Sequence, residues 1–344
     1  MGVERGLSPE SRAVVFKLAY ASHAPGRAAA GHGAHLRTPA IEPAGSFLSS
    51  SGWTQMAPPP LDYVPVPESF KLPAGLNFGG TSGIAINSKG HIFVLHRGPM
   101  PLMEFDPDGN FIRGFGDGLF DRPHGLRIDA RDNIWATDVA AHVGYKFDPT
   151  GRLEMVLGVK GRPGEFHDFG HLRLFNEPNE AVVGPTGDIF VLQGHGKGPS
   201  LVLKFDKDGN FIKAIGKQGA GPGEFDLPHS LVFDAKGLLY IADRNNARIQ
   251  VVDADGNYIR ESKHPGTPCG LFMSPDQHIW LAHGHTGQIM ELDLEGNVLG
   301  MMAGAGQGKT LGKYGEAHYI AVSARGEIFV ADTLNWRVQK YVKK

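Results

Sequence analysis

Three histidines stand in the same local setting at widely separated points of the chain. His124, His229 and His318 occur in PHGLRI, PHSLVF and AHYIAV, where each histidine directly precedes a run of alternating apolar residues. Three imidazoles that leave one coordination position open are the ligand set of catalytic zinc sites, and other borderline divalent ions accept the same ligands. This chemistry requires a fold that brings the three side chains to one point.

The segments around these histidines belong to an internal repeat. Copies begin at residues 83, 125, 180, 230, 270 and 319, so the spacings are 42, 55, 50, 40 and 49 residues. Such a period is typical of the four-stranded blades of a β-propeller. Each copy has alternating apolar residues and a turn such as DPDGN or DADGN, whose aspartate and glycine favour a tight hairpin. The sequence therefore predicts an all-β fold, a six-bladed β-propeller, whose repeats resemble the NHL repeat, with ADRNNARIQVVD the most typical segment.

The N-terminal part of the chain is expected to close the ring. The last copy ends after its third predicted strand, VQKYV, and LDYVPVP at residues 61–67 is available as the fourth. A blade completed by both ends of the chain leaves no exposed sheet edge. We therefore expect a propeller domain at residues 59–344 with this 3+1 closure. Residues 1–58 have little strand pattern and are expected to form a flexible or irregular extension.

Histidine alternates with other residues at one position of the repeat, the axial position. The residue before the first strand of successive copies is Ser82, His124, Asn179, His229, Cys269 and His318. The first strand lines the channel of a propeller, and alternate blades of a six-bladed ring lie about 120° apart around its axis. The three histidines are therefore expected to converge on the axis and bind zinc or another divalent transition metal. Unrelated polar rim residues are the alternative, but they would not be expected to alternate in this way.

The loops between the second and third strands open on the same channel mouth and supply further candidates. Arg97 and Arg244 are expected to hold a substrate carboxylate, because a guanidinium binds it through two parallel hydrogen bonds. Ion pairs with the neighbouring repeat aspartates are the alternative. His195, in a glycine-flanked loop, is the candidate proton carrier or substrate contact, and a solvated loop histidine is equally consistent with the sequence. Asn179 and Tyr319 lie at or beside the axial position and are predicted substrate contacts.

Other polar residues of the repeat have a structural interpretation. Asp138, Asp243 and Asp332 recur at one register, which favours turn capping or bonding between neighbouring blades over catalysis. His142 is predicted to form a buried structural hydrogen bond. Cys269 is predicted to pack as a small apolar group.

The composition argues against several classes of partner and site. The chain has 344 residues, a net charge of −2 with acidic and basic residues intermixed, and a single cysteine. A nucleic-acid surface, an internal disulfide and a cysteine-rich metal site are therefore not expected. No apolar run approaches the roughly 20 residues that span a bilayer. The N-terminal residues contain no convincing signal peptide, so the location is open, and the sequence carries no signal for an oligomeric state.

The ring resembles the peptidyl-α-hydroxyglycine α-amidating lyase family of six-bladed propellers, and their bacterial relatives in particular. The resemblance covers about residues 61–344 and is most specific in PHGLRIDARDNIWATDVAAHVGYKFD, with LPHSLVFDAKGLLYIADRNNARIQ and AHYIAVSARGEIFVADTLNWRVQKY beside it. It implies zinc held by His124, His229 and His318, with Arg97 and Arg244 serving the active site. It also implies a small-molecule or peptide-end substrate and an exported, periplasmic or secreted, protein.

Two departures from the family pattern affect the predicted chemistry. The third-blade loop that carries the family's proposed tyrosine base reads LQGHGKGPS, which puts His195 at or beside the tyrosine position. The aspartate that follows the third histidine in the animal enzymes and helps to hold a structural calcium is Tyr319, which argues against calcium.

Three functions follow from these observations. The first is a zinc-dependent lyase that cleaves a C–N or C–O bond at a hydroxylated carbon of a carbinolamide or hydroxy-acid-like substrate. The second uses the same site for hydrolysis of an ester or lactone by zinc-bound hydroxide. The third is a non-catalytic NHL-type binding scaffold, because a fold does not dictate a function. The alternating histidines favour an enzyme.

Overall fold

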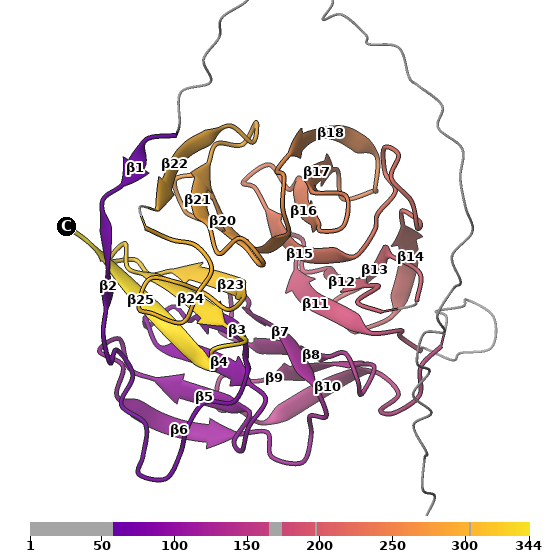
Figure 1. Ribbon diagram of the computed structural model, residues 1–344. Coiled ribbons are helices and arrows are strands. Elements are labelled where there is room, and N and C mark those ends of the chain that lie inside the picture. The colour runs from indigo at the N-terminus through magenta and orange to yellow at the C-terminus, as the bar shows by residue number, and fades with distance from the viewer. Residues whose placement is uncertain (1–57, 165–173, 197, 303) are drawn as a thin grey trace, which may run out of the picture. The chain divides into compact units, whose positions relative to one another are not determined.

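The described part of the chain folds into six sheets arranged around a central axis. Figure 1 shows the computed structural model, which describes residues 58–164, 174–196, 198–302 and 304–344. The prediction of an all-β, six-bladed propeller is confirmed. Within the described residues, no helix is long and apolar enough to cross a membrane. Nearly all of the predicted extension at residues 1–58 lies outside the described residues.

Each blade has its first strand at the channel and its fourth strand at the outside of the ring (Figure 1). Blades one to three consist of β3 (Thr81–Ile86), β4 (Ile92–His96), β5 (Leu102–Phe105) and β6 (Phe111–Phe115); β7 (Pro123–Ile128), β8 (Ile134–Asp138), β9 (Val143–Phe147) and β10 (Leu153–Gly158); and β11 (Pro178–Val183), β12 (Ile189–Gln193), β13 (Leu201–Phe205) and β14 (Phe211–Ile215). Blades four to six contain β15 (Pro228–Phe233), β16 (Leu239–Asp243), β17 (Arg248–Val252) and β18 (Tyr258–Lys263); β19 (Pro268–Met273), β20 (Ile279–His283), β21 (Ile289–Leu292) and β22 (Val298–Met302); and β23 (Ala317–Val322), β24 (Ile328–Asp332) and β25 (Arg337–Lys343).

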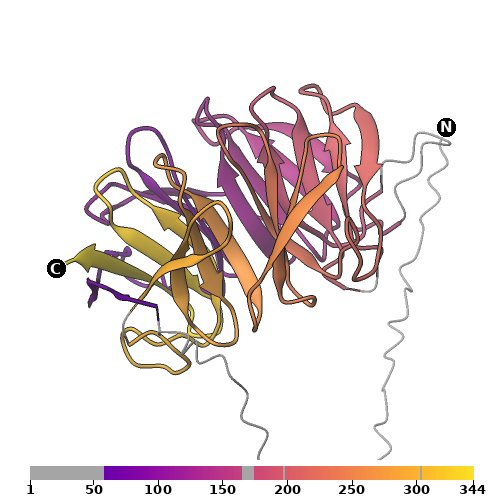
Figure 2. The same ribbon diagram turned by 90° about the horizontal axis from the view of Figure 1, so that it is seen from above.

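Two short N-terminal strands pair with the last two blades. β2 (Tyr63–Val66), within the segment expected to supply the closing strand, pairs antiparallel with β25 and is the fourth strand of blade six. β1 (Pro60–Leu61) pairs in parallel with β22 of blade five. Figure 2 shows β25, near the C-terminus, beside the indigo N-terminal segment. These pairings cover backbone groups that would otherwise form free sheet edges.

Apolar side chains fill the spaces between neighbouring blades. Phe105 of blade one and Phe329 of blade six are fully buried in one such cluster, and both pack with Phe70. Burial of one large apolar side chain contributes about 1.5–3 kcal/mol to the free energy of unfolding. The inter-blade clusters therefore hold the inner strands in fixed positions around the axis.

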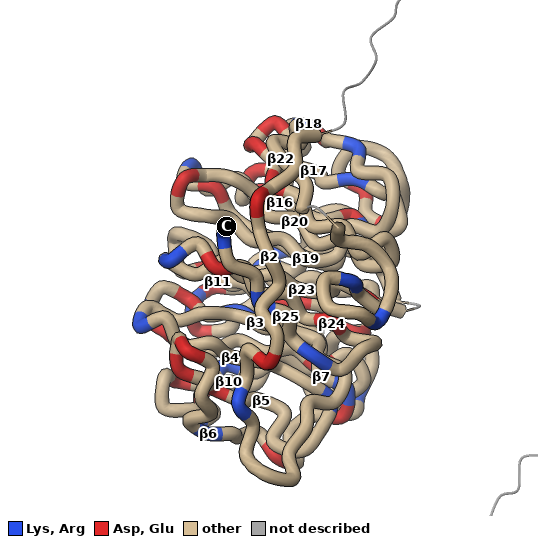
Figure 3. Tube along the Cα trace, turned by 60° about the vertical axis from the view of Figure 1, so that its left-hand side comes forward, with Lys and Arg blue, Asp and Glu red and all other residues tan. Residues whose placement is uncertain are grey.

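Charged residues of both signs are distributed over the chain trace, as Figure 3 shows.

The predicted hairpin turns recur with one geometry. The carboxylate of Asp106 accepts hydrogen bonds from the backbone N–H groups of Asp108 and Asn110, and Gly109 has a φ of +80°. Asp206 and Asp253 begin the same kind of turn in blades three and four. A residue with a Cβ atom is strained at this φ, which explains the glycine of the DPDGN and DADGN segments.

Two buried histidines lie outside the axial cluster: His264 directly follows β18 of blade four, and His283 ends β20 of blade five. Burial lowers the pKa of each to about 4, and for His283 the proximity of His264 adds to the effect. The unfolded chain binds a proton on each residue near pH 6.5, whereas the folded chain does so only near pH 4. Their contribution to stability is therefore fully present above pH 6.5 and is lost as the pH falls toward 4.

We expect the free energy of unfolding to decrease between pH 6.5 and pH 4 by up to about 3 kcal/mol for each of these histidines. Denaturant titration of wild type and of His264→Gln/His283→Gln, both metal-free, measures this difference. The double variant should lose less stability over that range. Equal pH dependence in the two proteins would contradict the assignment.

Candidate metal centre at the propeller axis

The axial histidines lie in β-bulges at the start of the inner strands. The pairing register shifts between Pro123 and Leu126 in β7, and between Pro228 and Ser230 in β15. The same irregularity occurs at the start of β23, which contains His318. An extra residue in a bulge leaves the regular ladder, so its side chain takes a direction that a regular strand would not give it. This local geometry allows each histidine to point into the channel.

The last residue of the second strand holds the loop that leads into each inner strand. In blades two, four and six this residue is an aspartate that accepts a hydrogen bond from the backbone N–H located three residues before the axial histidine. The bonds join Asp121 to Asp138, Asp226 to Asp243 and Gly315 to Asp332, at 2.6, 2.7 and 2.9 Å. The prediction that these aspartates stabilise the repeat is therefore confirmed. Glu177 donates its backbone N–H to Nδ1 of His142, so the structural hydrogen bond predicted for that histidine is present, although the residue is half-buried and not buried as predicted.

The three axial histidines come together in the channel. The ring centroids of His124 and His229 are 4.9 Å apart, those of His124 and His318 are 4.7 Å apart, and those of His229 and His318 are 4.8 Å apart. All three side chains are buried. Residues separated by about 100 positions in the sequence thus form one cluster, as the alternation around the ring predicts.

Backbone carbonyls fix the orientation of all three rings. Nδ1 of each histidine hydrogen-bonds to the carbonyl oxygen of the residue at the axial position of the following blade. These bonds link His124 to Asn179 at 2.9 Å, His229 to Cys269 at 3.1 Å and His318 to Ser82 at 2.7 Å. A carbonyl only accepts hydrogen bonds, so Nδ1 carries the proton and Nε2 keeps its lone pair. This is the arrangement that orients histidine ligands in metal sites.

The free nitrogens have the properties that metal ligands need. Nε2 of His124 and Nε2 of His229 are buried and have no hydrogen-bond partner in the described part of the chain. Burial, together with neighbouring histidines, lowers the pKa of both residues well below 6.5, and burial lowers the pKa of His318 to about 4. All three rings are therefore neutral at pH 7, the state in which imidazole binds a metal. The donor set fits zinc and other borderline divalent ions.

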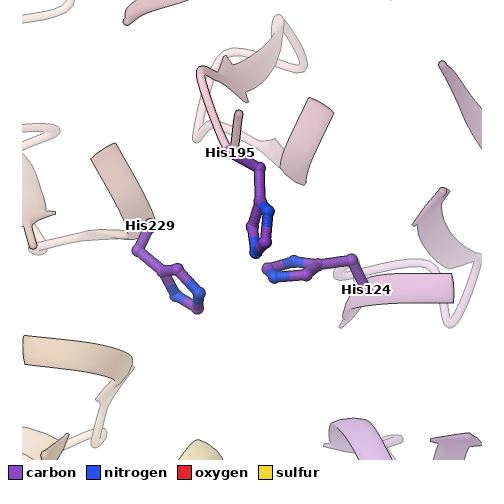
Figure 4. Close-up of side chains that lie close together, drawn as sticks. All are labelled: His124, His195 and His229. Carbon is purple, nitrogen blue, oxygen red and sulfur yellow. The ribbon is translucent and has the colours of Figure 1, made fainter. Parts of the chain in front are cut away.

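A fourth histidine, His195, joins this cluster. Figure 4 shows its ring beside those of His124 and His229, and one ring nitrogen from each of the three lies within 4.8 Å of the others. The His195 and His124 ring centroids are 4.5 Å apart. Burial lowers the pKa of His195 to about 3, and the proximity of His318 and of three arginines adds to the effect. His195 is therefore a neutral, largely buried side chain and not a solvated loop histidine.

The loop of His195 depends on glycine. A Cβ atom on Gly196 would lie 2.2 Å from a carboxylate oxygen of Glu177, and Gly194 has a φ of +119°. These glycines let the backbone pass close to Glu177, whose Oε2 lies 3.9 Å from Nδ1 of His195. The position of His195 is thus set by its loop, whereas the other three histidines are set by strands.

The two predicted arginines differ in their partners. Arg244 forms an ion pair with Glu316 at 3.2 Å, so the alternative pairing with a repeat aspartate is wrong. Arg248 takes that place and lies 2.8 Å from Asp243. Among the described residues, no carboxylate lies within 4.0 Å of Arg97, whose Nε donates to the Pro123 carbonyl oxygen at 3.4 Å. Burial and the nearby Arg122 lower the pKa of Arg97. Of these two arginines, Arg97 is therefore the one without an acidic partner among the described residues.

The remaining predicted residues are buried around the cluster. Asn179 donates through Nδ2 to the Pro228 carbonyl oxygen at 2.6 Å, which leaves its buried Oδ1 without a partner among the described residues. The Tyr319 hydroxyl donates to the His229 carbonyl oxygen at 3.1 Å. Burial raises the pKa of Cys269 to about 12, so its thiol stays protonated, as its predicted packing role requires. The substrate-binding roles of Asn179 and Tyr319 stay predictions.

Glu316 and Arg122 lie beside the cluster but were not among the residues predicted from the sequence. Each lies two residues before an axial histidine, in GEAH and DRPH. Burial raises the pKa of Glu316, but His318 and Arg244 outweigh this effect, so the net shift is downward and the carboxylate is ionised. Comparison of this position across the six copies would have indicated charged residues beside the axis. It would not have indicated which arginine pairs with Glu316.

Comparisons with known proteins agree with the fold and indicate the family. A family model described as a 6-bladed beta-propeller matches residues 186–296. The probable peptidyl-alpha-hydroxyglycine alpha-amidating lyase of Caenorhabditis elegans is 31% identical over 287 residues, which cover 74% of this chain and 79% of the nematode protein. NHL repeat-containing protein 3 of mouse is 33% identical over 187 residues; the match covers 52% of this chain and 53% of the mouse protein, about half its length. A solved streptogramin B lyase has a TM-score of 0.60 at 16% identity, over 82% of this chain and 98% of that chain, which shows a shared fold.

Metal analysis can separate the roles of the four histidines. We expect wild-type protein, purified without chelator or histidine tag, to contain about one zinc per chain. His124→Ala/His229→Ala should lose the metal because it removes two of the free Nε2 atoms. His195→Ala should keep it, since no backbone carbonyl orients that ring as a ligand. Plasma mass spectrometry gives the metal content, and loss of zinc from His195→Ala would show that His195 is a ligand.

Proposed function

Because the chain belongs to the family of six-bladed NHL-repeat propellers that includes the peptidyl-α-hydroxyglycine α-amidating lyases, we propose that it is a zinc-dependent lyase. Its proposed substrate is a small hydroxylated molecule that carries a carboxylate, such as a carbinolamide. The observation that supports this proposal most strongly is the cluster of three buried imidazoles whose Nδ1 atoms are held by backbone carbonyls.

His124, His229 and His318 would hold the metal through Nε2. A bound zinc ion would supply Lewis-acid polarisation of a substrate oxygen and lower the pKa of its hydroxyl group. The neutral state of the three rings supports this role because no proton must be displaced from Nε2 before binding.

Arg97 is the proposed site for the substrate carboxylate. It is exposed to solvent and has no acidic partner in the described chain, so its guanidinium is free to pair with an incoming anion. Arg244 is neutralised by Glu316 and is therefore a weaker anion site unless that pair opens. The free Oδ1 of Asn179 can accept a hydrogen bond from a substrate N–H or O–H group.

His195 is the proposed proton acceptor. It is neutral and lies against His124, but a pKa of about 3 makes it a weak base. It would therefore take the hydroxyl proton of a carbinolamide only where bound zinc had lowered the pKa of that hydroxyl group. The O–H electron pair then forms the new carbonyl bond, the C–N bond breaks, and its electron pair goes to the amide nitrogen, which gains a proton. The products are an amide and an aldehyde acid such as glyoxylate.

Hydrolysis of an ester or lactone at the same site is the second candidate. It is favoured by one specific observation, the presence of His195 in the loop where the resemblance implies a tyrosine. A neutral imidazole is suited to accept a proton from an attacking water molecule.

Product analysis in ¹⁸O-labelled water distinguishes the two reactions. With an N-acyl-α-hydroxyglycine, we expect an unlabelled amide, because lyase cleavage adds no solvent oxygen to the acyl product. With a lactone or ester, we expect no turnover. Conversion of the lactone or ester to an acid whose carboxylate carries one solvent oxygen would instead establish hydrolysis. Metal-free wild type and His124→Ala/His229→Ala serve as inactive controls.

Substitution of the two arginines tests the substrate assignment. A charge-assisted hydrogen bond contributes about 1.5–3 kcal/mol, so Arg97→Met should raise KM for the carboxylate substrate by about 10- to 100-fold. Arg244→Met should have the smaller effect because that guanidinium is already paired. Steady-state kinetics with the acid and with its methyl ester measures both constants. An equal effect of Arg97→Met on acid and ester would exclude a carboxylate contact at Arg97.

A further inference from the structure

The residues directly after the axial positions form a second layer of the channel. They are Gly83, Gly125, Glu180, Ser230, Gly270 and Tyr319. A Cβ atom on Gly125 would lie 2.4 Å from the carbonyl oxygen of Asn179, so the inner strands approach each other closely at the glycines. The other three blades carry polar side chains at this level, and all three side chains are buried.

Arg127 of blade two joins these side chains across the axis. Its Nε lies 2.7 Å from Oε1 of Glu180 in blade three, although the N–H is not directed at that oxygen. Its Nη2 donates to Oγ of Ser230 in blade four at 2.9 Å and to the carbonyl oxygen of Leu271 in blade five at 2.8 Å. The guanidinium carbon lies 5.8 Å from the ring centroid of Tyr319 in blade six. One side chain thus contacts the inner strands of four other blades.

Each partner of Arg127 adjoins a part of the candidate metal centre. Glu180 follows Asn179, whose carbonyl oxygen holds Nδ1 of His124. Ser230 follows His229, and Tyr319 follows His318 while its hydroxyl bonds to the His229 carbonyl oxygen. The backbone N–H of Leu231 also donates to Oε2 of Glu180 at 2.7 Å. Displacement of this network would therefore move the inner strands that carry the histidines.

We propose that Arg127 and Glu180 are positioning residues, which form an axial clamp that sets how closely Nε2 of His124, His229 and His318 converge. This inference rests on the metal site proposed above. The clamp does not contact the substrate. It links the inner strands of blades two to five, and Tyr319 extends the contact to blade six. Supporting groups of this kind change metal affinity by about 10- to 100-fold in proteins when they are removed.

A matched pair of arginines separates positioning from general stabilisation. Arg113 of blade one pairs with the buried Glu104 at 2.5 Å, donates to the Pro149 carbonyl oxygen of blade two, and lies 5.2 Å from the Phe115 ring centroid. It thus makes the same types of contact as Arg127, but on the outer strand β6. Arg113→Met is the control for Arg127→Met.

The experiment measures zinc affinity by chelator competition in wild type, Arg127→Met, Arg127→Met/Glu180→Gln and Arg113→Met, together with thermal unfolding of the metal-free proteins. We expect zinc affinity to fall by about 10- to 100-fold in both Arg127 variants and to stay unchanged in Arg113→Met. The double variant should unfold at a higher temperature than Arg127→Met because it leaves no unpaired buried charge. The visible spectrum of the cobalt-substituted protein should change only in the two Arg127 variants.

Two results would overturn the proposal in different ways. If wild type binds zinc and Arg127→Met binds it equally well with an unchanged cobalt spectrum, the network only stabilises the fold. If wild type takes up neither zinc nor cobalt, the proposed metal site does not exist. The axial clamp then has no metal site to position.

Discussion

The hydrogen bonds from the axial imidazoles to backbone carbonyls are the interaction on which the centre depends. Three blades supply histidines, and the three blades between them supply the carbonyl oxygens of Ser82, Asn179 and Cys269. Each bond sets the tautomer and rotation of a ring and also joins two neighbouring inner strands. The bond from His318 to Ser82 connects the last blade to the first. The site thus requires the closed ring, because half of its groups come from blades that carry no histidine.

The charges beside this centre are arranged unevenly. Arg244 and Glu316 neutralise each other at 3.2 Å, whereas Arg97 has no carboxylate within 4.0 Å among the described residues. An exposed guanidinium without a counter-ion is free to bind an anion through charge-assisted hydrogen bonds. The chain pairs two strongly buried arginines, Arg127 with Glu180 and Arg248 with Asp243. The exposed Arg97 has no such partner, and its Nε donates to the carbonyl oxygen of Pro123, the neighbour of a histidine of the cluster.

Much of the fold and part of the centre could be predicted from the sequence. The repeat period indicated the six blades, and the alternation at the axial position indicated which histidines meet. Both predictions rest on the regular repeat, because equivalent residues of successive blades lie at the same height in the channel. The pairing of Arg244 with Glu316 could not be predicted, because it joins residues of two blades across the mouth. The contacts of Arg127 join blade two to residues of blades three, four and five, and no single repeat contains that information.

The order of residues along the inner strands also restricts how a substrate can approach. At the level after the histidines, the axis contains the buried side chains of Glu180 and Tyr319, with Arg127 across them. The Tyr319 ring centroid lies 5.0 Å from that of His318 and 5.8 Å from that of His229, so this layer directly adjoins the imidazoles. On the side before the histidines lie Arg122 and Glu316, each two residues earlier in the chain, and Arg122 is exposed. A ligand that reaches Nε2 must therefore pass the charged groups of the mouth, which makes them the first groups to select among substrates.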